Sequence, residues 1–436
     1  AFKKKDRETR FDLSEAPLVR ITLIKTGEES YTMYYTNHHI LTDGWSMSIV
    51  IDELLQAYQV IFHGGVPEEI QEDRYRDYID FIGKKDPFEE EDFWKNYMAT
   101  LDSPTLLPFV SADHDRNKTA GETNLTSLVV GKELTDMIKG YAQEHGLTVN
   151  SITQGVWSLL LSKYTGSQDV IFGVTVSGRP PEMEFSDELV GLYINTLPLY
   201  GAIPEGPIVD WLIALQMGHT ECREHQYTNL SIIQSLSGVK GDLFDSIMVF
   251  ENFPEAEASE GGEQVLEVDD METIDPTNYP LTIVVNLTEK LDIEFGYNSS
   301  LISEQTIEMI KGHFRTVLEQ IINANVSEIS EIDLLTAGER TELLDVFNGT
   351  DVDYALDVGF VGMFESRVSK SPDGIALSFE GETMSYGELD ALSNRIAHYL
   401  VSKGVVPDSL VGICLDRSLW MIAGVVGILK SGGGYV

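Results

Sequence analysis

Residues 31–44, YTMYYTNHHILTDG, join an alternating apolar run to a polar loop that carries two adjacent histidines. The run 31–36 predicts a strand, which pairs across a polar turn at 25–29 with a strand at 19–24. An amphipathic helix is expected from about 46 to 58, because apolar residues recur there on one face. The histidine pair therefore ends an apolar strand and precedes a helix.

The loop 38–44 holds residue types that are able to do chemistry. His38 and His39 lie at the edge of the strand, Asp43 follows four residues after His39, and Gly44 lets the backbone come close to a ligand. Standing alone this spacing is weakly specific, since an ordinary surface loop or a hydrogen-bonded histidine produces the same pattern. A metal site is a poorer interpretation, because the neighbouring sequence supplies no third ligand.

The pattern beyond this loop predicts more α/β structure. A helical region at 74–101 leads into a crossover at 102–122, after which a second lobe begins. We expect its strands at 125–130, 170–176, 195–199, 246–250, 281–286 and 291–297, and its helices at 132–145, 149–165, 208–226 and 304–323. The acidic stretch 254–272 is expected to form a loop.

A separate α/β segment is expected near the end of the sequence. Its predicted strands are 375–379 and 410–414, and its predicted helices are 386–403 and 418–430. We therefore divide the chain into four parts, which are a first lobe at 1–110, a second lobe at 111–330, a linker at 331–360 and a last segment at 361–436.

Composition limits the classes of function. The 71 acidic and 30 basic side chains give a formal net charge of −41, which disfavours binding to nucleic acid or to an anionic membrane surface. The two cysteines, Cys222 and Cys414, supply neither a disulfide framework nor a cysteine zinc site, so a reducing, cytoplasmic location is expected. No apolar run is long enough to span a bilayer. Both ends of the sequence look cut, which indicates a fragment.

The motif His38-His39-x-x-x-Asp43-Gly44 resembles the HHxxxDG motif of condensation domains from nonribosomal peptide synthetases. Further blocks of that family follow in the family's order, so that the resemblance covers about residues 10–330. They are FDLSEAPL at 11–18, YRDY at 75–78, VSGRP at 176–180, GLYINTLPL at 191–199, LFD at 243–245 with FENFP at 250–254, and NYPL at 278–281. Several ordered matches are far more specific than one.

The end of the sequence resembles a second family. MSYGEL at 384–389 and LKSGGGY at 429–435 are similar to the first two core motifs of adenylate-forming enzymes. The resemblance implies an α/β fold of two parts: a two-lobed chloramphenicol-acetyltransferase-like condensation domain with a truncated first lobe, then a partial adenylation domain. ATP and Mg²⁺ would serve only the complete adenylation domain, whose phosphate-binding loop does not occur in this sequence. No cofactor and no metal are expected on this chain.

The resemblance also implies roles for individual residues. The substrates would be thioesters on the phosphopantetheine arms of upstream and downstream peptidyl carrier domains, with the adenylation domain in cis. His39 would accept a proton from the attacking amine or orient it, beside His38. Asp43 would brace the loop through an ion pair to Arg179, Gly44 would leave room for the substrates, and Asn252 is a further candidate near the reaction centre.

Other interpretations stay open. A coenzyme-A-dependent HxxxD acyltransferase and an epimerization domain share the histidine motif, and a catalytically silent platform that docks carrier domains is also possible. Because a full condensation domain of this family has a further section before residue 11, we expect the isolated chain to be inactive and poorly stable. The donor and acceptor amino acids, the stereochemistry of the donor, the position of the module, the oligomeric state and the final peptide are not determined by the sequence.

Overall fold

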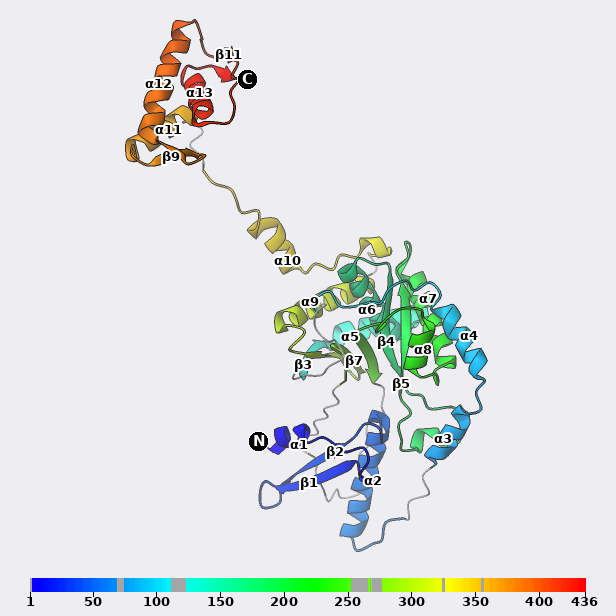
Figure 1. Cartoon of the computed structure of the whole chain (residues 1–436). Helices are drawn as coiled ribbons and strands as arrows, with labels where there is room; N and C mark the ends of the chain where they lie inside the picture. Colours follow the sequence, from blue (N-terminus) through cyan, green and yellow to red (C-terminus); the bar gives the residue numbers. More distant parts are fainter. Residues whose placement is uncertain are drawn as a thin grey trace. The chain divides into compact units, whose positions relative to one another are not determined.

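The structure is a computed structural model that describes residues 2–68, 74–110, 123–251, 266, 268, 277–323, 326–353 and 357–436. The chain divides into two compact units, 1–340 and 341–436, and each is described by itself (Figure 1). The predicted loop at 254–272 falls almost wholly outside the described residues.

The first lobe of unit 1 is a β-hairpin with two helices, which confirms the predicted strands and helix. Its elements are α1 Phe2–Glu8, β1 Val19–Lys25, β2 Tyr31–Asn37 and α2 Gly44–Phe62. The hairpin is antiparallel, with Leu23 opposite Met33. Helix α2 is longer than predicted, and much of its apolar face remains exposed, since Leu54 and Tyr58 are 40% and 44% exposed. This lobe therefore buries little of its own apolar surface.

Helices α3 Tyr75–Ile82 and α4 Pro87–Tyr97 connect the first lobe to the second. Asp86 caps the start of α4, since its carboxylate accepts a hydrogen bond from the amide of Phe88, and Glu89 and Glu90 lie in the first turn of the helix. Trp94 of α4 is fully buried in the main core of the second lobe. Side chains from the range 87–110, which we assigned to the first lobe from the sequence, thus pack in the core of the second lobe.

The second lobe is built on a mixed sheet that, within the described residues, has six strands in the order β3-β8-β7-β6-β4-β5. The pairs β4/β6 and β6/β7 are parallel and the other pairs are antiparallel. All predicted strands are confirmed, with bounds β3 Thr123–Val130, β4 Asp169–Val176, β5 Asn195–Ala202, β6 Ser246–Glu251, β7 Leu281–Leu287 and β8 Leu291–Asn298. The near-continuous burial of β4 agrees with its unbroken apolar sequence.

Helices pack beside this sheet, with α6 in contact with α5, α7, α9 and β4 (Figure 1). They are α5 Lys132–His145, α6 Val149–Thr165, α7 Ile208–Glu224, α8 Leu230–Leu236 and α9 Glu304–Ile321, with short 3₁₀ turns at Ser186–Glu188 and Ile329–Glu331. The bounds of α5 and α6 agree with the prediction because Gly146 and Gly166 end them in the left-handed conformation. Helix α8 was not predicted.

Unit 2 begins at the end of α10 Ala337–Thr341 with a π-helical turn at Glu342–Val346 and continues as a small α/β segment. Its elements are α11 Phe360–Lys370, β9 Ile375–Phe379, β10 Glu382–Ser385, α12 Tyr386–Ser402, β11 Leu410–Val411, α13 Leu419–Lys430 and β12 Gly434–Tyr435. The predicted elements are present, although β11 is shorter than expected and α11 and β10 were not predicted. Its core gathers around Phe364, Leu389, Ala423 and Val426.

Candidate functional site

The loop 38–43 runs from the end of β2 to the start of α2. Its turn is closed by hydrogen bonds: the amide of Leu41 donates to the carbonyl of His38 at 3.0 Å, and Asn37 Nδ2 donates to Thr42 Oγ1 at 2.7 Å. Asp43 then caps α2, since its carboxylate accepts a hydrogen bond from the amide of Ser46. The loop is therefore held by its own backbone and by the helix that follows.

The side chain of His39 is exposed to solvent and its orientation is defined. His39 Nδ1 lies 2.9 Å from the carbonyl oxygen of Thr42. Because a carbonyl oxygen only accepts hydrogen bonds, Nδ1 carries the proton in the neutral ring and the lone pair is on Nε2. This tautomer is the one in which Nε2 is able to accept a proton or a hydrogen bond.

His38 differs from its neighbour in both burial and hydrogen bonding. Its ring is half-buried and lies edge-on to Phe11, with centroids 6.3 Å apart. His38 Nδ1 accepts a hydrogen bond from the amide of Ile40 at 3.1 Å, so it belongs to the folding of the loop. Of the two histidines, His39 is the one that the loop presents outward.

Asp43 is buried, and its carboxylate is surrounded by hydrogen-bond donors. Oδ1 lies 2.8 Å from the amide nitrogen of Ser46 and 2.7 Å from its hydroxyl oxygen. Oδ2 accepts hydrogen bonds from the amides of Tyr193 at 3.0 Å and Ile194 at 3.3 Å. These two amides come from the second lobe, so Asp43 joins the loop of the first lobe to the start of β5.

Arg179 lies where the resemblance implies, with Nη2 3.4 Å from Asp43 Oδ1 and both side chains 2% exposed. Nη2 also donates to Ser46 Oγ at 2.9 Å, while Nη1 donates to the carbonyls of Ser186 and Leu189. Burial lowers the pKa of the guanidinium, and the Asp43 carboxylate opposes that shift. The forked guanidinium thus holds the loop after β4 against the first turn of α2.

Sequence reasoning missed Ser46, which is fully buried at the centre of this network. Its hydroxyl lies 2.7 Å from the carbonyl oxygen of Gly191 and 3.1 Å from the Gly191 amide nitrogen. The available signal was Asp43 standing three residues before Ser46 at a predicted helix start. Gly44 is the first residue of α2 and is half-buried, and Asn252 lies outside the described residues.

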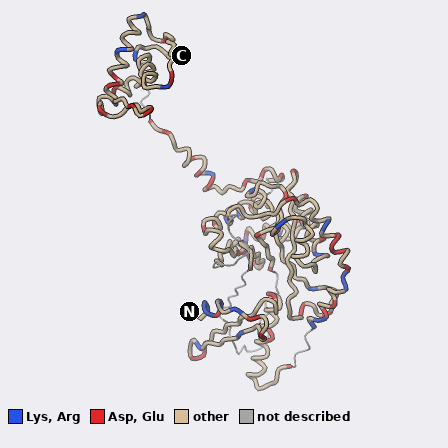
Figure 2. Tube along the Cα trace, viewed as in Figure 1, with Lys and Arg blue, Asp and Glu red and all other residues tan. Residues whose placement is uncertain are grey.

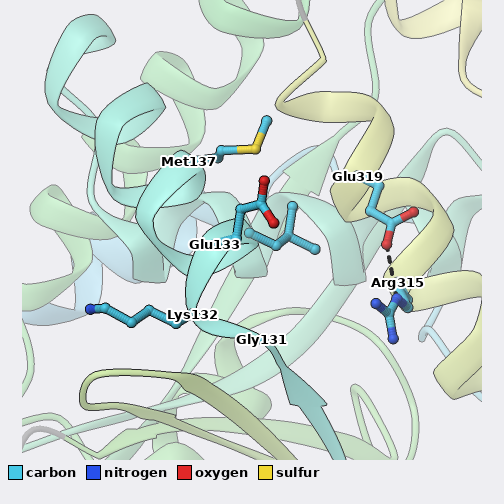
Figure 3. Close-up of a pocket in the computed structure, with 7 residues that line it drawn as sticks. Gly131, Lys132, Glu133, Met137, Arg315 and Glu319 are labelled. Atoms are coloured by element: carbon cyan, nitrogen blue, oxygen red, sulfur yellow. Dashed lines mark hydrogen bonds and ion pairs between the residues drawn. The ribbon is translucent and has the colours of Figure 1, made fainter.

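Other parts of unit 1 offer weaker sites. A surface pocket between α5 and α9 is lined by residues such as Lys132 and Met137, and its Arg315 is paired with Glu319 at 2.8 Å (Figure 3). None of the candidate residues lines it.

Figure 2 shows Asp and Glu scattered along the trace of both units. Across the described residues, no group of three or more His, Cys, Asp or Glu is arranged to hold a metal ion.

In the part of the chain that the structure describes, no helix has both the length and the apolar character needed to cross a bilayer. Cys222 is buried, Cys414 is exposed, and the two form no disulfide.

Comparison with protein families agrees with this fold and site. Residues 1–344 match the family model for the condensation domain, and residues 364–436 match the model for AMP-binding enzymes. Since the first match covers well over half of the chain, the protein belongs to the condensation-domain family.

The relatives are nonribosomal peptide synthetases. The chain is 36% identical over its whole length to a linear gramicidin synthase of Brevibacillus parabrevis and 34% identical over 99% of its length to bacitracin synthase 3 of Bacillus licheniformis. It spans only 9% and 7% of those two proteins. A solved four-domain nonribosomal peptide synthetase bound to AMP and glycine matches all of the chain with a TM-score of 0.82 at 19% identity, covering 34% of that structure. The predicted two-lobed condensation fold with a partial adenylation domain is confirmed.

Proposed function

We propose that this condensation domain forms a peptide bond between two thioesters, each carried on the phosphopantetheine arm of a peptidyl carrier domain. The upstream carrier would bring an aminoacyl or peptidyl thioester, and the downstream carrier an aminoacyl thioester. Membership of the family and the intact His39–Asp43–Gly44 set support this proposal.

The orientation of His39 is the observation that carries the proposal. The hydrogen bond from Nδ1 to the Thr42 carbonyl puts the lone pair of the neutral ring on Nε2, and the side chain is exposed. A histidine kept in one tautomer by its other nitrogen is the usual arrangement for a general base.

In the proposed reaction, the α-amine of the downstream substrate attacks the carbonyl carbon of the upstream thioester. A C–N bond forms, the C–S bond breaks, and the thiolate leaves with the upstream arm. The amine loses a proton, which His39 Nε2 accepts and which finally neutralises the thiolate. A free α-amine has a pKa of roughly 8, so a useful fraction of it is neutral and nucleophilic at about pH 7, and the thioester is already activated. Much of the catalysis would therefore come from holding both reactants in attack geometry. His39 would then be a base, a positioning group for the amine, or both.

In this proposal the supporting residues hold or shape the loop and do not take part in the chemical step. Asp43 and Arg179 would fix the loop without touching substrate, because protein groups surround the carboxylate. Gly44, at the start of α2, would leave room for the substrates, and Asn252 stays a proposed neighbour of the reaction centre.

The partners follow from the same proposal. We expect carrier domains on both sides and an adenylation domain in cis, since the relatives are synthetases and residues 364–436 match AMP-binding enzymes. ATP and Mg²⁺ would act on a complete adenylation domain, and we propose no adenylation by this chain. A cytoplasmic location fits two cysteines that form no disulfide.

The test is His39→Ala in the full-length synthetase, with both carriers loaded and dipeptide formation followed by mass spectrometry. Loss of a general base is expected to lower the rate by about 10²- to 10⁴-fold. His63→Ala is the matched control, because His63 is exposed at the opposite end of α2. A wild-type rate for His39→Ala would contradict the catalytic role.

The same assay separates the alternatives. A silent docking platform would bind loaded carriers but release no dipeptide even as wild type. An epimerization domain would instead exchange the Cα hydrogen of the upstream aminoacyl group with solvent deuterium, and a coenzyme-A-dependent acyltransferase would accept acyl-coenzyme A in place of the loaded upstream carrier.

A further inference from the structure

The segment 191–194, just before β5, contacts the candidate site through its backbone. The amides of Tyr193 and Ile194 donate to Asp43 Oδ2, and the carbonyl of Gly191 accepts from the amide of Asp43 at 3.3 Å. The position of this segment therefore determines where the Asp43 carboxylate lies.

The carbonyls of the same segment are held from another direction by helix α3. Tyr75 donates its hydroxyl to the carbonyl of Leu192 at 2.8 Å, and Tyr78 donates to the carbonyl of Tyr193 at 3.4 Å. Burial raises the pKa of Tyr78, so its hydroxyl keeps the proton that it donates. Segment 191–194 is thus held between Asp43 on one side and the two α3 tyrosines on the other.

Ring packing fixes this arrangement further. The ring of Tyr193 lies 5.4 Å from that of Tyr75 and 4.6 Å from that of Tyr78, measured between centroids. A Cβ added to Gly191 would lie 2.3 Å from the Tyr75 ring, and one added to Gly178 would lie 1.8 Å from the Tyr193 carbonyl oxygen. Glycine at position 191 lets segment 191–194 lie close to α3, and glycine at position 178 lets the loop after β4 lie close to the same segment.

We propose that Tyr75 is a positioning residue for the reaction. Its hydroxyl fixes the carbonyl of Leu192, this fixes the neighbouring amides of segment 191–194, and those amides set Asp43 and the loop that carries His39. Tyr78 contributes in the same way through its longer hydrogen bond. The inference deepens the proposed function and rests on it for its kinetic test.

Tyr75→Phe in the full-length synthetase removes one hydroxyl and keeps the ring. We expect kcat for dipeptide formation to fall about 5- to 10-fold, the effect of losing one hydrogen bond that acts on the reacting geometry, with KM for the loaded acceptor carrier unchanged. Tyr78→Phe should have a smaller effect. Tyr58→Phe is the control, since Tyr58 is an exposed tyrosine of α2, and it should match the wild type.

Two further measurements separate positioning from a general loss of structure. In a His39→Ala background, Tyr75→Phe should cause no additional loss of rate, because it acts through His39. Hydrogen exchange of the Tyr193 and Ile194 amides should be faster in Tyr75→Phe while unfolding of the rest of unit 1 is unchanged. A wild-type kcat for Tyr75→Phe, or an equal fractional loss in both backgrounds, would overturn the proposal.

The outcome is distinguishable from failure of the proposed function. If the wild-type synthetase released no dipeptide, the proposed function would fail, and if His39→Ala kept full activity, only the catalytic role of His39 would fail. In both cases the exchange of the Tyr193 and Ile194 amides would still test the link to Tyr75. If His39→Ala lost activity and Tyr75→Phe changed neither kcat nor exchange, only the positioning role would be wrong.

Discussion

Replacing Asp43 by Asn tests whether the carboxylate holds the two lobes together. Among the described residues, its two oxygens face four N–H donors and the Ser46 hydroxyl, all within 3.4 Å. The side chain of Asn has nearly the same shape, but one oxygen becomes an NH₂ group that donates hydrogen bonds. Whichever way the amide turns, that NH₂ group must face donors from Ser46 and Arg179 or from Tyr193 and Ile194.

The cost follows from these contacts. At least two hydrogen bonds to a charged acceptor are lost, each worth about 1.5–3 kcal/mol. The change also leaves the buried Arg179 without its counter-ion, and breaking such a pair costs about 3–5 kcal/mol in total. Since the two effects describe overlapping contacts, we expect Asp43→Asn to lower the free energy of unfolding of unit 1 by about 3–5 kcal/mol. That is a large part of the roughly 5–15 kcal/mol that stabilises a typical protein.

The assay is hydrogen exchange measured by mass spectrometry at increasing urea, which follows peptides of unit 1 separately from those of unit 2. The control is Asp80→Asn, because Asp80 lies on the exposed face of α3, and it should change stability by less than about 0.5 kcal/mol. A loss below about 1 kcal/mol for Asp43→Asn would refute the reasoning that this carboxylate joins the lobes.

Two further predictions concern unit 1. Arg179→Lys keeps the charge but loses the forked guanidinium that reaches the Ser186 carbonyl, so the free energy of unfolding should fall by about 2 kcal/mol in urea denaturation. The control is Arg315→Lys, because Arg315 lies in an exposed ion pair, and this change should lower the free energy of unfolding by less than about 0.5 kcal/mol. Burial, and secondarily Arg223, lower the pKa of His219 to about 4. Between pH 6.5 and 4 the unfolded chain therefore binds a proton that the folded chain does not, and stability falls as the pH falls. His219→Gln should remove roughly 1 kcal/mol of the loss measured between about pH 7.5 and 5.5, and an unchanged pH dependence would contradict this.

The local elements could be predicted from the sequence because their signals are local. Helices α5 and α6 were predicted with their observed bounds, since Gly146, Thr148 and Gly166 mark where they end and begin. Helix α8 was missed because seven residues hold too few periodic positions. The helical region predicted at 74–101 contains α4, but local sequence does not report that Trp94 packs in the core of the second lobe.

For the candidate site too, the residues close together in sequence could be predicted and the contacts between distant residues could not. The loop with His38, His39 and Asp43 is contiguous in sequence, so its motif was visible. Ser46 meets the backbone of Gly191 across 145 positions of the chain, and no local pattern reports such a contact. The pair of Arg179 with Asp43 was expected only through family resemblance.

The two halves of the motif also have different surroundings. Protein donors face both oxygens of Asp43, so the carboxylate would have to give up its own structural contacts before it could act on a substrate. His39 donates its Nδ1 proton to the Thr42 carbonyl, which places the basic lone pair of the ring on Nε2. The site also lies at the amino end of α2, where the first N–H groups of a helix lack intrahelical partners and favour negative charge. We therefore expect the amine to meet His39, and the developing negative charge on the thioester oxygen to be stabilised near Gly44, the first residue of that helix.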